Sequence, residues 1–373
     1  MPKIFIAGDF GYRGRTKSVI ESGCSDILFN QLNSEIRTAD LSILNFETPV
    51  GDSSHFIEKC GPKLCCDKKA VKAIKAAGFS LLTLANNHFF DCGQYGVEQT
   101  ISACNEYGIS YVGGGITLST AIRPYQLAIS GTKITIINVC ETEFSIATDT
   151  HGGSAPLDIV DVARNIISNK GTSKVIVIVH GGHEFYQLPS TRMQKMYRFF
   201  IDLGASAIIN HHQHCFSGYE IYNECPIFYG LGNFIFDSTI NRRNEMWNYG
   251  YCVELDTENI SNFKIIPYLQ SNEEPGLRLL TKEEKLFFSQ KISELNDIIS
   301  SESKLKDEEM RFYSQGSISF LNPFYNGLTA KLYGKKWFPS FVSKNHRYYQ
   351  LHYIQCESHR DILLYNLKKF LDI

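Results

Sequence analysis

The chain has 373 residues, of which 43% are hydrophobic and 20% are charged, a balance typical of folded globular proteins. Its 37 basic and 39 acidic side chains give a net charge of -2, so it lacks the excess positive charge of a general nucleic-acid or anionic-membrane binder. We therefore expect no nucleic-acid partner, and the length suits either two domains or one large one.

The chain also lacks the usual signals of secretion and membrane insertion. Its start, "MPKIFIAGDF", holds an apolar stretch that stops before Asp9 and is too short for a signal peptide. No later apolar run approaches the length that spans a bilayer. The 11 cysteines, an odd number without paired spacing apart from Cys65 and Cys66, favour thiols of a reducing compartment. We predict a cytoplasmic protein with no membrane span.

The first two thirds of the chain alternate short apolar strands with segments of helical period, the pattern of a layered α/β fold. The predicted strands span residues 3–7, 41–45, 81–84, 109–112, 134–139, 175–179 and 207–209, and another begins within residues 224–237. The predicted helices span residues 25–38, 68–77, 96–107, 160–170 and 192–203. Gly78 and Gly204 follow two of these helices as C-terminal stops.

The pattern changes after residues 237–250. Two further predicted strands, 251–255 and 263–269, precede the polar stretch "QSNEEPG" (270–276). We therefore predict a catalytic domain over residues 1–270 and an accessory segment over 271–373. In that segment, residues 281–306 form a charged helix, 319–341 are aromatic and irregular, and 358–371 form a final amphipathic helix.

Five of the predicted strands end in side chains that can bind a metal ion. In chain order these side chains are Asp9; Asn45 and Glu47; Asn86, Asn87 and His88; His180, His183 and Glu184; and His211, His212 and His214. The loops at the carboxyl ends of strands in an open α/β sheet converge on one crevice. We therefore expect these groups to form one site.

The donor types in this site suit one or two divalent cations. Imidazole, amide and carboxylate groups together form a mixed nitrogen and oxygen site for Mn, Fe or Zn, with Asp9 and Glu47 supplying negative charge. In an extended "HQH" segment, His212 and His214 point to the same side. On this geometry His211 points away and does not coordinate.

Motifs in the first 240 residues carry a family resemblance. They are "GDF" (8–10), "NFETPV" (45–50), "NNHFFDCG" (86–93), "VHGGHEF" (179–185), "HHQH" (211–214) and "PIFYGLGNFIFD" (226–237). In this order they resemble the CapA, or poly-γ-glutamate capsule synthesis, proteins, which share the calcineurin-like metallophosphoesterase architecture. The resemblance implies a four-layer α/β sandwich, which the C-terminal segment follows.

The resemblance also implies roles for particular residues. The implied metal ligands are Asp9 and His214 for one ion, Asn87, His180 and His212 for the other, and Glu47 as a bridge. His88 would protonate the leaving group, and Asp91 would orient His88. The implied activity is metal-dependent hydrolysis of a phosphate ester in capsule or cell-surface polymer metabolism.

Two positions depart from the pattern of related phosphoesterases. Gly11 stands where a histidine is usual, and Glu47 stands where a bridging aspartate is usual. Two alternatives remain open, of which Gly11 motivates the second. One is an amide hydrolase, ligase or transferase of polymer biosynthesis, and the other is a non-enzymatic assembly factor with an impaired metal site.

Candidate substrate contacts flank the predicted metal ligands. We expect an anionic small-molecule or polymer substrate, which Arg13 can clamp, although Arg13 and Arg15 also suit a solvated loop. His183 and Glu184 either contact the substrate or lie on a solvated loop. The sequence does not indicate an oligomeric state.

Overall fold

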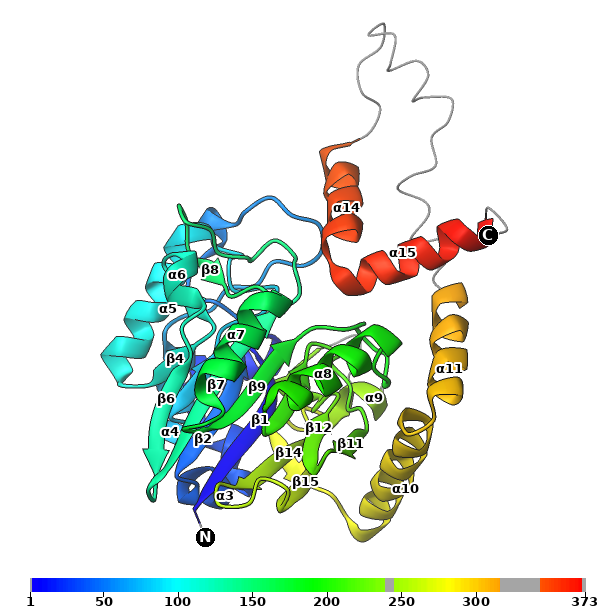
Figure 1. Ribbon diagram of the computed structural model, residues 1–373. Helices are drawn as coiled ribbons and strands as arrows, with labels where there is room; N and C mark the ends of the chain where they lie inside the picture. The colour runs from blue at the N-terminus through cyan, green and yellow to red at the C-terminus, as the bar shows by residue number, and fades with distance from the viewer. Residues whose placement is uncertain (1, 239–244, 316–342, 371–373) are drawn as a thin grey trace, which may run out of the picture.

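The computed structural model describes residues 2–238, 245–315 and 343–370. Two β-sheets pack face to face, and helices cover their outer faces (Figure 1). The predicted four-layer α/β sandwich is confirmed.

The first sheet has the strand order β16-β15-β14-β1-β2-β3-β4, and β13 also pairs with β1. Its strands are β1 (Lys3–Gly11), β2 (Leu41–Phe46), β3 (Leu81–Thr83), β4 (Ser110–Val112), β13 (Asn233–Phe236), β14 (Tyr249–Asp256), β15 (Phe263–Gln270) and β16 (Leu277–Leu279). The pairings from β1 through β4 and between β1 and β13 are parallel, whereas β14, β15 and β16 add antiparallel strands.

The second sheet has the order β11-β12-β10-β9-β7-β6. Its strands are β6 (Tyr125–Ile129), β7 (Thr132–Cys140), β9 (Lys174–His180), β10 (Ala207–His211), β11 (Tyr219–Tyr222) and β12 (Cys225–Phe228). A short ribbon pairs β5 (Gly114–Gly115) with β8 (Gly153–Ser154). Because β7, β9, β10 and β12 run parallel, their carboxyl ends share one edge of the sheet.

The alternation of side chains along β1 explains the layers. Ile4 and Ile6 join the core between the two sheets, whereas Phe5 and Ala7 join the core under the helices. The helices on the first sheet are α1 (Gly14–Glu21), α2 (Asp26–Phe29), α3 (Asn33–Thr38), α4 (Lys69–Ala77) and α5 (Gly93–Tyr107). Those on the second sheet are α7 (Ile159–Asn169) and α8 (Thr191–Leu203), and α6 (Leu118–Ala121) and α9 (Glu245–Asn248) are single turns.

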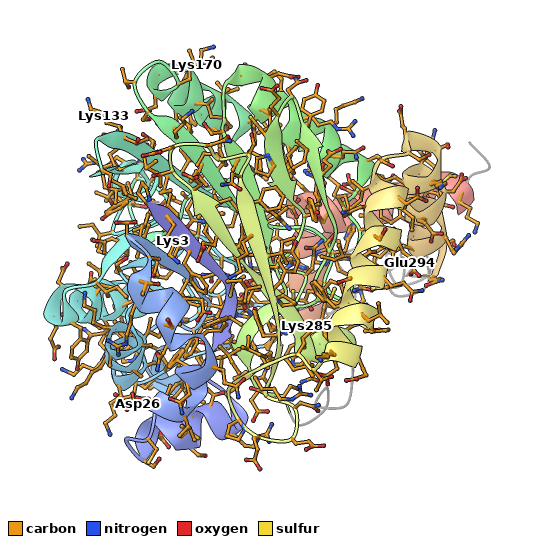
Figure 2. All side chains as sticks on the ribbon, turned by 90° about the horizontal axis from the view of Figure 1, so that it is seen from below. Lys3, Asp26, Lys133, Lys170, Lys285 and Glu294 are labelled. Atoms are coloured by element: carbon orange, nitrogen blue, oxygen red, sulfur yellow. The ribbon has the colours of Figure 1, made fainter. Side chains whose placement is uncertain are left out.

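The parallel strands of both sheets begin on the same side of the molecule. Lys3 begins β1, and Lys133 lies near the start of β7; both are labelled in the view from below (Figure 2). The carboxyl ends of the parallel strands therefore lie together on the opposite side of the molecule.

Two segments that we predict as single continuous helices are each interrupted in the structure. The segment predicted as one helix over 25–38 is broken into α2, a 3-10 turn (Asn30–Leu32) and α3, because φ of -114° at Phe29 and -121° at Leu32 leave the helical path while both side chains enter the core. The helix predicted over 281–306 is split into α10 (Lys282–Ile299) and α11 (Glu302–Gln315). The Ser300 hydroxyl bonds the Asp297 carbonyl, which competes with a continuing helix.

The C-terminal part of the described chain packs against the sandwich. β16 pairs with β15, and Phe288 and Ile292 of α10 join the larger hydrophobic core. The predicted division at residue 270 stays a prediction, and the aromatic segment 319–341 lies entirely outside the described residues. In the described ranges, no helix combines the length and apolar character needed to cross a bilayer.

Two further helices, α14 (Lys344–Gln355) and α15 (Glu357–Phe370), lie above the sandwich in Figure 1. An ion network fastens α15 to the core. Arg192 of α8 donates to Glu141, which directly follows β7, and to Asp361 of α15, both at 2.6 Å. The Glu141 side chain is 4% exposed and that of Arg192 is 29% exposed, so the pair is largely removed from water.

We predict that Arg192→Met lowers the free energy of unfolding by about 2–3 kcal/mol, because it leaves the buried Glu141 carboxylate without its cation. Urea denaturation checks this value. Arg164→Met, which removes a pair whose side chains are 76% and 46% exposed, is the matched control and should change stability by less than about 0.5 kcal/mol. Equal effects of the two substitutions would contradict the prediction.

The same pair predicts a dependence on pH. Burial by itself would raise the pKa of Glu141, but Arg192 and hydrogen bonds lower it to about 2, below its ordinary value of 4.5. The contribution of the Glu141–Arg192 pair to the free energy of unfolding is therefore complete above about pH 4.5 and is lost as the pH falls toward 2. Unfolding curves of the wild type and Glu141→Gln should converge over this range, and a constant difference between them would refute the assignment.

Candidate metal centre

A β-bulge at the end of β1 places the Asp9 carboxylate. The pairing of β1 shifts between Ala7 and Asp9 against β2, and between Asp9 and Phe10 against β13. Gly8 permits the close approach of β13, because a Cβ there would lie 2.0 Å from the Gly232 carbonyl oxygen. The "GDF" motif thus combines a position that requires glycine with the carboxylate that the bulge presents.

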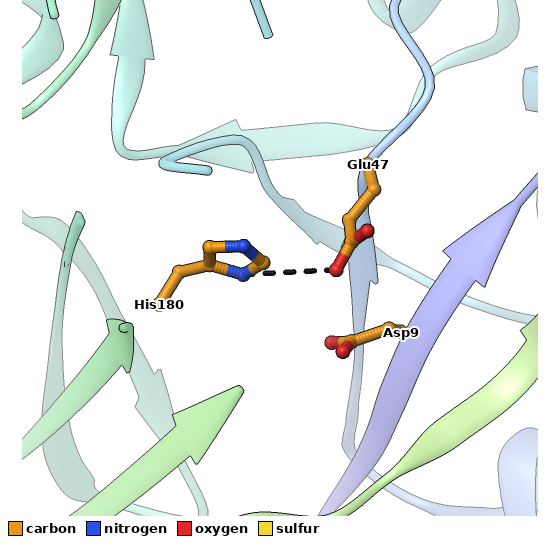
Figure 3. A group of neighbouring side chains, drawn as sticks. All are labelled: Asp9, Glu47 and His180. Carbon is orange, nitrogen blue, oxygen red and sulfur yellow. Dashed lines mark ion pairs between the residues drawn. The ribbon is translucent and has the colours of Figure 1, made fainter. Parts of the chain in front are cut away.

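Asp9, Glu47 and His180 come together at the carboxyl ends of β1, β2 and β9. One donor atom from each lies within 4.8 Å of those of the other two. Figure 3 shows the three side chains facing one another, with His180 Nδ1 3.8 Å from Glu47 Oε1. Their exposed fractions are 1%, 0% and 2%, respectively. Asn45 Nδ2 donates to Asp9 Oδ1 at 2.8 Å and to Glu47 Oε1 at 3.3 Å, which links the two carboxylates.

The electrostatics of this group favour a cation. Burial and the negative charge of Asp9 raise the pKa of Glu47 well above its ordinary value. Burial would also raise the pKa of Asp9, but the neighbouring histidines, His211 first among them, hold it well below its ordinary value. Within the described residues, Glu47 Oε2 is buried without a hydrogen-bond partner. An unsatisfied carboxylate oxygen beside a second carboxylate fits a divalent ion.

All three histidines of "HHQH" reach this centre, so the prediction that His211 points away is wrong. His211 Nδ1 lies 3.1 Å from Asp9 Oδ1, His212 Nδ1 lies 3.1 Å from His180 Nε2, and His214 Nδ1 lies 3.6 Å from Asp9 Oδ2. The segment is not extended, because φ is +96° at His212 and +54° at His214. These left-handed residues replace the two-residue alternation on which the prediction depended.

The remaining predicted ligand, Asn87, also lies here. Its Oδ1 is 3.2 Å from His180 Nε2. His214 Nε2 lies 3.9 Å from Glu47 Oε2, and Asn233 Oδ1 contacts His214 Nδ1 at 2.9 Å. The six predicted metal residues therefore form one buried cluster of oxygen and nitrogen donors, which fits the donor preferences of Mn, Fe or Zn.

Position 11 has no room for a larger side chain. A Cβ on Gly11 would lie 2.6 Å from the Phe236 ring. A histidine at this position is therefore incompatible with Phe236 where it lies. His211 instead supplies an imidazole next to the carboxylate of Asp9.

His88 and Asp91 form a polar unit beside Asn87. His88 Nδ1 lies 2.7 Å from Asp91 Oδ2, the Leu64 backbone N–H donates to the same oxygen at 2.7 Å, and Lys59 Nζ donates to Asp91 Oδ1. Burial would raise the pKa of Asp91, but His88 and Lys59 lower it. Asp91 is thus an ionised group that holds the His88 ring in one orientation.

A pocket of about 300 Å³ opens beside this unit. His88, Asn87, Lys59, Glu143, His183 and Glu184 are among its lining residues. Burial raises the pKa of Glu143 to about 8. The candidate substrate residues His183 and Glu184 therefore face a cavity next to the cluster.

The two arginines that follow Asp9 are placed differently. Arg13 is exposed at the start of α1 and is not among the residues that line the pocket. Its role in substrate binding stays a prediction. Arg15 bonds Asp237 and the carbonyl oxygens of residues 271–273, so it is a structural tie and the solvated interpretation is wrong for it.

Sequence reasoning missed several polar residues at the pocket, among them Lys59 and Glu143. Glu143 carried a usable signal, because it lies three residues beyond Cys140, the last residue of β7, and the strand-end argument applies to it as well. Lys59 lies in a loop between β2 and α4, and no local pattern distinguishes it from a surface lysine.

Comparisons with known proteins agree with these motifs. Residues 3–238 match a family described as "Bacterial capsule synthesis protein PGA_cap". Similar proteins include the "Capsule biosynthesis protein CapA" of Bacillus anthracis, 29% identical over 64% of this chain and 61% of that protein, and the "PGA biosynthesis protein CapA" of Bacillus subtilis, 29% identical over 64% of each. The chain thus spans somewhat less than two thirds of the length of these relatives.

Solved structures show a more distant likeness. A 5'-nucleotidase precursor from Thermus thermophilus is 13% identical, with a TM-score of 0.40 over 79% of this chain and 58% of that one. A 5'-nucleotidase from Candida albicans is 10% identical, with a TM-score of 0.42 over 80% and 58%.

We predict that Asp9→Asn weakens divalent-metal binding, because it removes a buried negative charge from the cluster. With the wild type, Mn²⁺ at about 100 times its Kd should add about 2.7 kcal/mol to the free energy of unfolding. This gain should largely disappear in Asp9→Asn, as measured by denaturation with and without Mn²⁺ and by metal analysis of the dialysed protein. Asp26→Asn, at an exposed residue of α2, should keep the gain. An undiminished gain in Asp9→Asn would refute the assignment.

Proposed function

Because the chain belongs to the bacterial capsule synthesis protein family, we propose that it is a metal-dependent hydrolase acting on a phosphate ester in capsule or cell-surface polymer metabolism. The observation that carries the proposal is the buried convergence of Asp9, Glu47 and His180. A cluster of this kind next to an open pocket is the arrangement that a catalytic metal site requires.

The proposed metal ligands are the six predicted residues. Asp9 and His214 would hold one ion, Asn87, His180 and His212 would hold a second, and Glu47 would contribute to both. His211 is added as a further ligand or as a hydrogen-bond donor to Asp9, because its Nδ1 lies 3.1 Å from that carboxylate. Divalent ions in such a site supply Lewis-acid stabilisation of the phosphoryl oxygens.

His88 is the proposed proton donor to the leaving group. Asp91 accepts from His88 Nδ1, so the Nε2 atom is the one that can exchange a proton with the substrate. Asn86 Oδ1 accepts from the His88 backbone N–H at 3.0 Å, which fixes the turn that carries the imidazole.

Lys59 is the proposed positioning residue for this unit. It donates to Asp91 Oδ1 and, at 3.2 Å, to the Asn87 carbonyl, so one buried ammonium group joins the proton donor to the adjacent ligand. Its charge also keeps Asp91 ionised, which retains the hydrogen on His88 Nδ1.

One observation favours a second candidate, a non-enzymatic assembly factor. The Phe236 ring takes the place of a side chain at position 11, so one imidazole usual in related phosphoesterases is lost. The nearby His211 argues against an impaired site, and we therefore rank hydrolysis first.

We predict that the full chain hydrolyses a phosphodiester such as bis(4-nitrophenyl) phosphate when Mn²⁺ is added. His88→Ala should lower kcat by about 10²–10⁴-fold, because it removes a general acid. His55→Ala should leave kcat unchanged, since the His55 side chain is 41% exposed. Steady-state kinetics measure both variants.

A γ-glutamyl 4-nitroanilide assayed in parallel tests the amide alternative. Metal-dependent cleavage of the anilide alone would replace phosphate-ester chemistry by amide chemistry. Turnover of neither substrate, with no effect of His88→Ala on the amount of capsule polymer made by cells that express the protein, would favour the assembly factor.

A further inference from the structure

The C-terminal helices supply one wall of the pocket beside the metal centre. This wall consists of Phe312 from α11, Tyr349, His352 and Tyr353 from α14, and His359 and Ile362 from α15. All six residues lie beyond residue 238, where the match to the family ends. The wall is therefore a feature of this chain's own C-terminal segment, whereas the metal ligands belong to the matched part.

Specific contacts hold the wall in place. Glu357 accepts from the Thr142 backbone N–H at 2.8 Å and from its hydroxyl at 3.2 Å. The His352 ring stacks on Phe144, with the ring centres 5.6 Å apart, and Asn366 Nδ2 donates to the Tyr313 carbonyl at 2.9 Å. Contacts on both sides of the pocket thus fix the positions of α14 and α15 relative to β7 and α11.

The wall presents rings that carry hydrogen-bonding groups. The ring centres of His352 and His359 are 4.4 Å apart, and Tyr353 lies 5.9 Å from each of them. His352 is 8% exposed, and its Nδ1 lies 3.6 Å from Glu143 Oε2. Imidazole and phenol groups donate and accept hydrogen bonds, and their flat faces also offer apolar contact area.

The described lining of the pocket offers no unpaired lysine or arginine to a polyanionic occupant. Lys59 is the single lysine or arginine among the described residues that line the pocket. Its ammonium group is bound to Asp91. Glu143 and Glu184 line the same pocket. In the described lining, a row of carboxylates would therefore meet the Glu184 carboxylate and no unpaired lysine or arginine.

We propose that the C-terminal wall binds an uncharged, hydroxyl-bearing ring of the sugar class, attached to the group that reacts at the metal centre. Tyr349, Tyr353 and His352 are its specificity-determining residues. The ring stacks on the phenol faces, and its hydroxyl groups bond the imidazole and phenol heteroatoms. The placement of the reacting group rests on the proposed hydrolase function, whereas the ring preference rests on the wall alone.

The test compares two phosphonates that cannot be hydrolysed, so that binding is separated from turnover. Isothermal titration of the full chain with Mn²⁺ measures the Kd of methylphosphonate and of the methylene phosphonate analogue of glucose 1-phosphate. We expect the sugar phosphonate to bind at least about tenfold more tightly than methylphosphonate, because methylphosphonate has no ring for the wall to contact. A tri-γ-glutamate peptide, the third ligand, should bind more weakly than the sugar phosphonate.

Variants of the wall identify the residues responsible. Tyr349→Ala and Tyr353→Ala should each remove most of the preference for the sugar phosphonate and leave the Kd of methylphosphonate unchanged. Tyr349→Phe keeps the ring face and should retain part of the preference. Leu351→Ala, at a 44% exposed residue of the same helix, is the matched control and should retain all of it. Circular dichroism confirms that each variant is folded.

The outcomes separate this inference from the proposed function. Equal affinities for the two phosphonates, no binding of the sugar phosphonate, or equal weakening of both ligands by Tyr349→Ala would each overturn the sugar-binding wall. Tighter binding of tri-γ-glutamate would overturn it in favour of a polyanionic polymer. A preserved sugar preference without hydrolysis of any phosphate ester would support the wall and refute the proposed hydrolase.

Discussion

Two carboxylates buried side by side, Asp9 and Glu47, impose the constraint on which the rest of the centre depends. Neither can be removed from water at low cost, and each disfavours ionisation of the other. Asn45, which donates to both, and the surrounding imidazoles offset part of that repulsion. Glu47 Oε2 stays unsatisfied within the described residues, which leaves a specific place for a cation. The surrounding donor residues are organised around these two carboxyl groups.

The face-to-face packing of the two sheets makes such a centre feasible. Asp9 and Glu47 come from the first sheet, whereas His180 comes from the second, as does the cluster of His211, His212 and His214. Parallel strands bring their carboxyl ends to one edge of each sheet, and the shared apolar core aligns the two edges. The bulge at Gly8 and Asp9 then makes the final adjustment, because it moves one carboxylate out of the regular pleat.

The C-terminal helices connect the stability of the molecule to the shape of its pocket. Arg192 bridges Glu141 at the end of β7 and Asp361 on α15, so the same ion network that satisfies a buried carboxylate also seats the pocket wall. The family match ends before these helices begin. The donor cluster of the matched part and the pocket wall beyond it are therefore separate parts of the chain.

The sequence by itself determined the layered α/β fold and the gathering of Asp9, Glu47, Asn87, His88 and His180 at one edge, because apolar strand periodicity and the residues that follow each strand are local properties. Tertiary structure decided the rest. The direction of His211 depends on left-handed backbone at His212 and His214, which no two-residue alternation contains. Lys59 and His352 reach the pocket from a loop and from a distant helix, and contacts between segments so far apart in the chain depend on how the layers pack, which local sequence patterns do not encode.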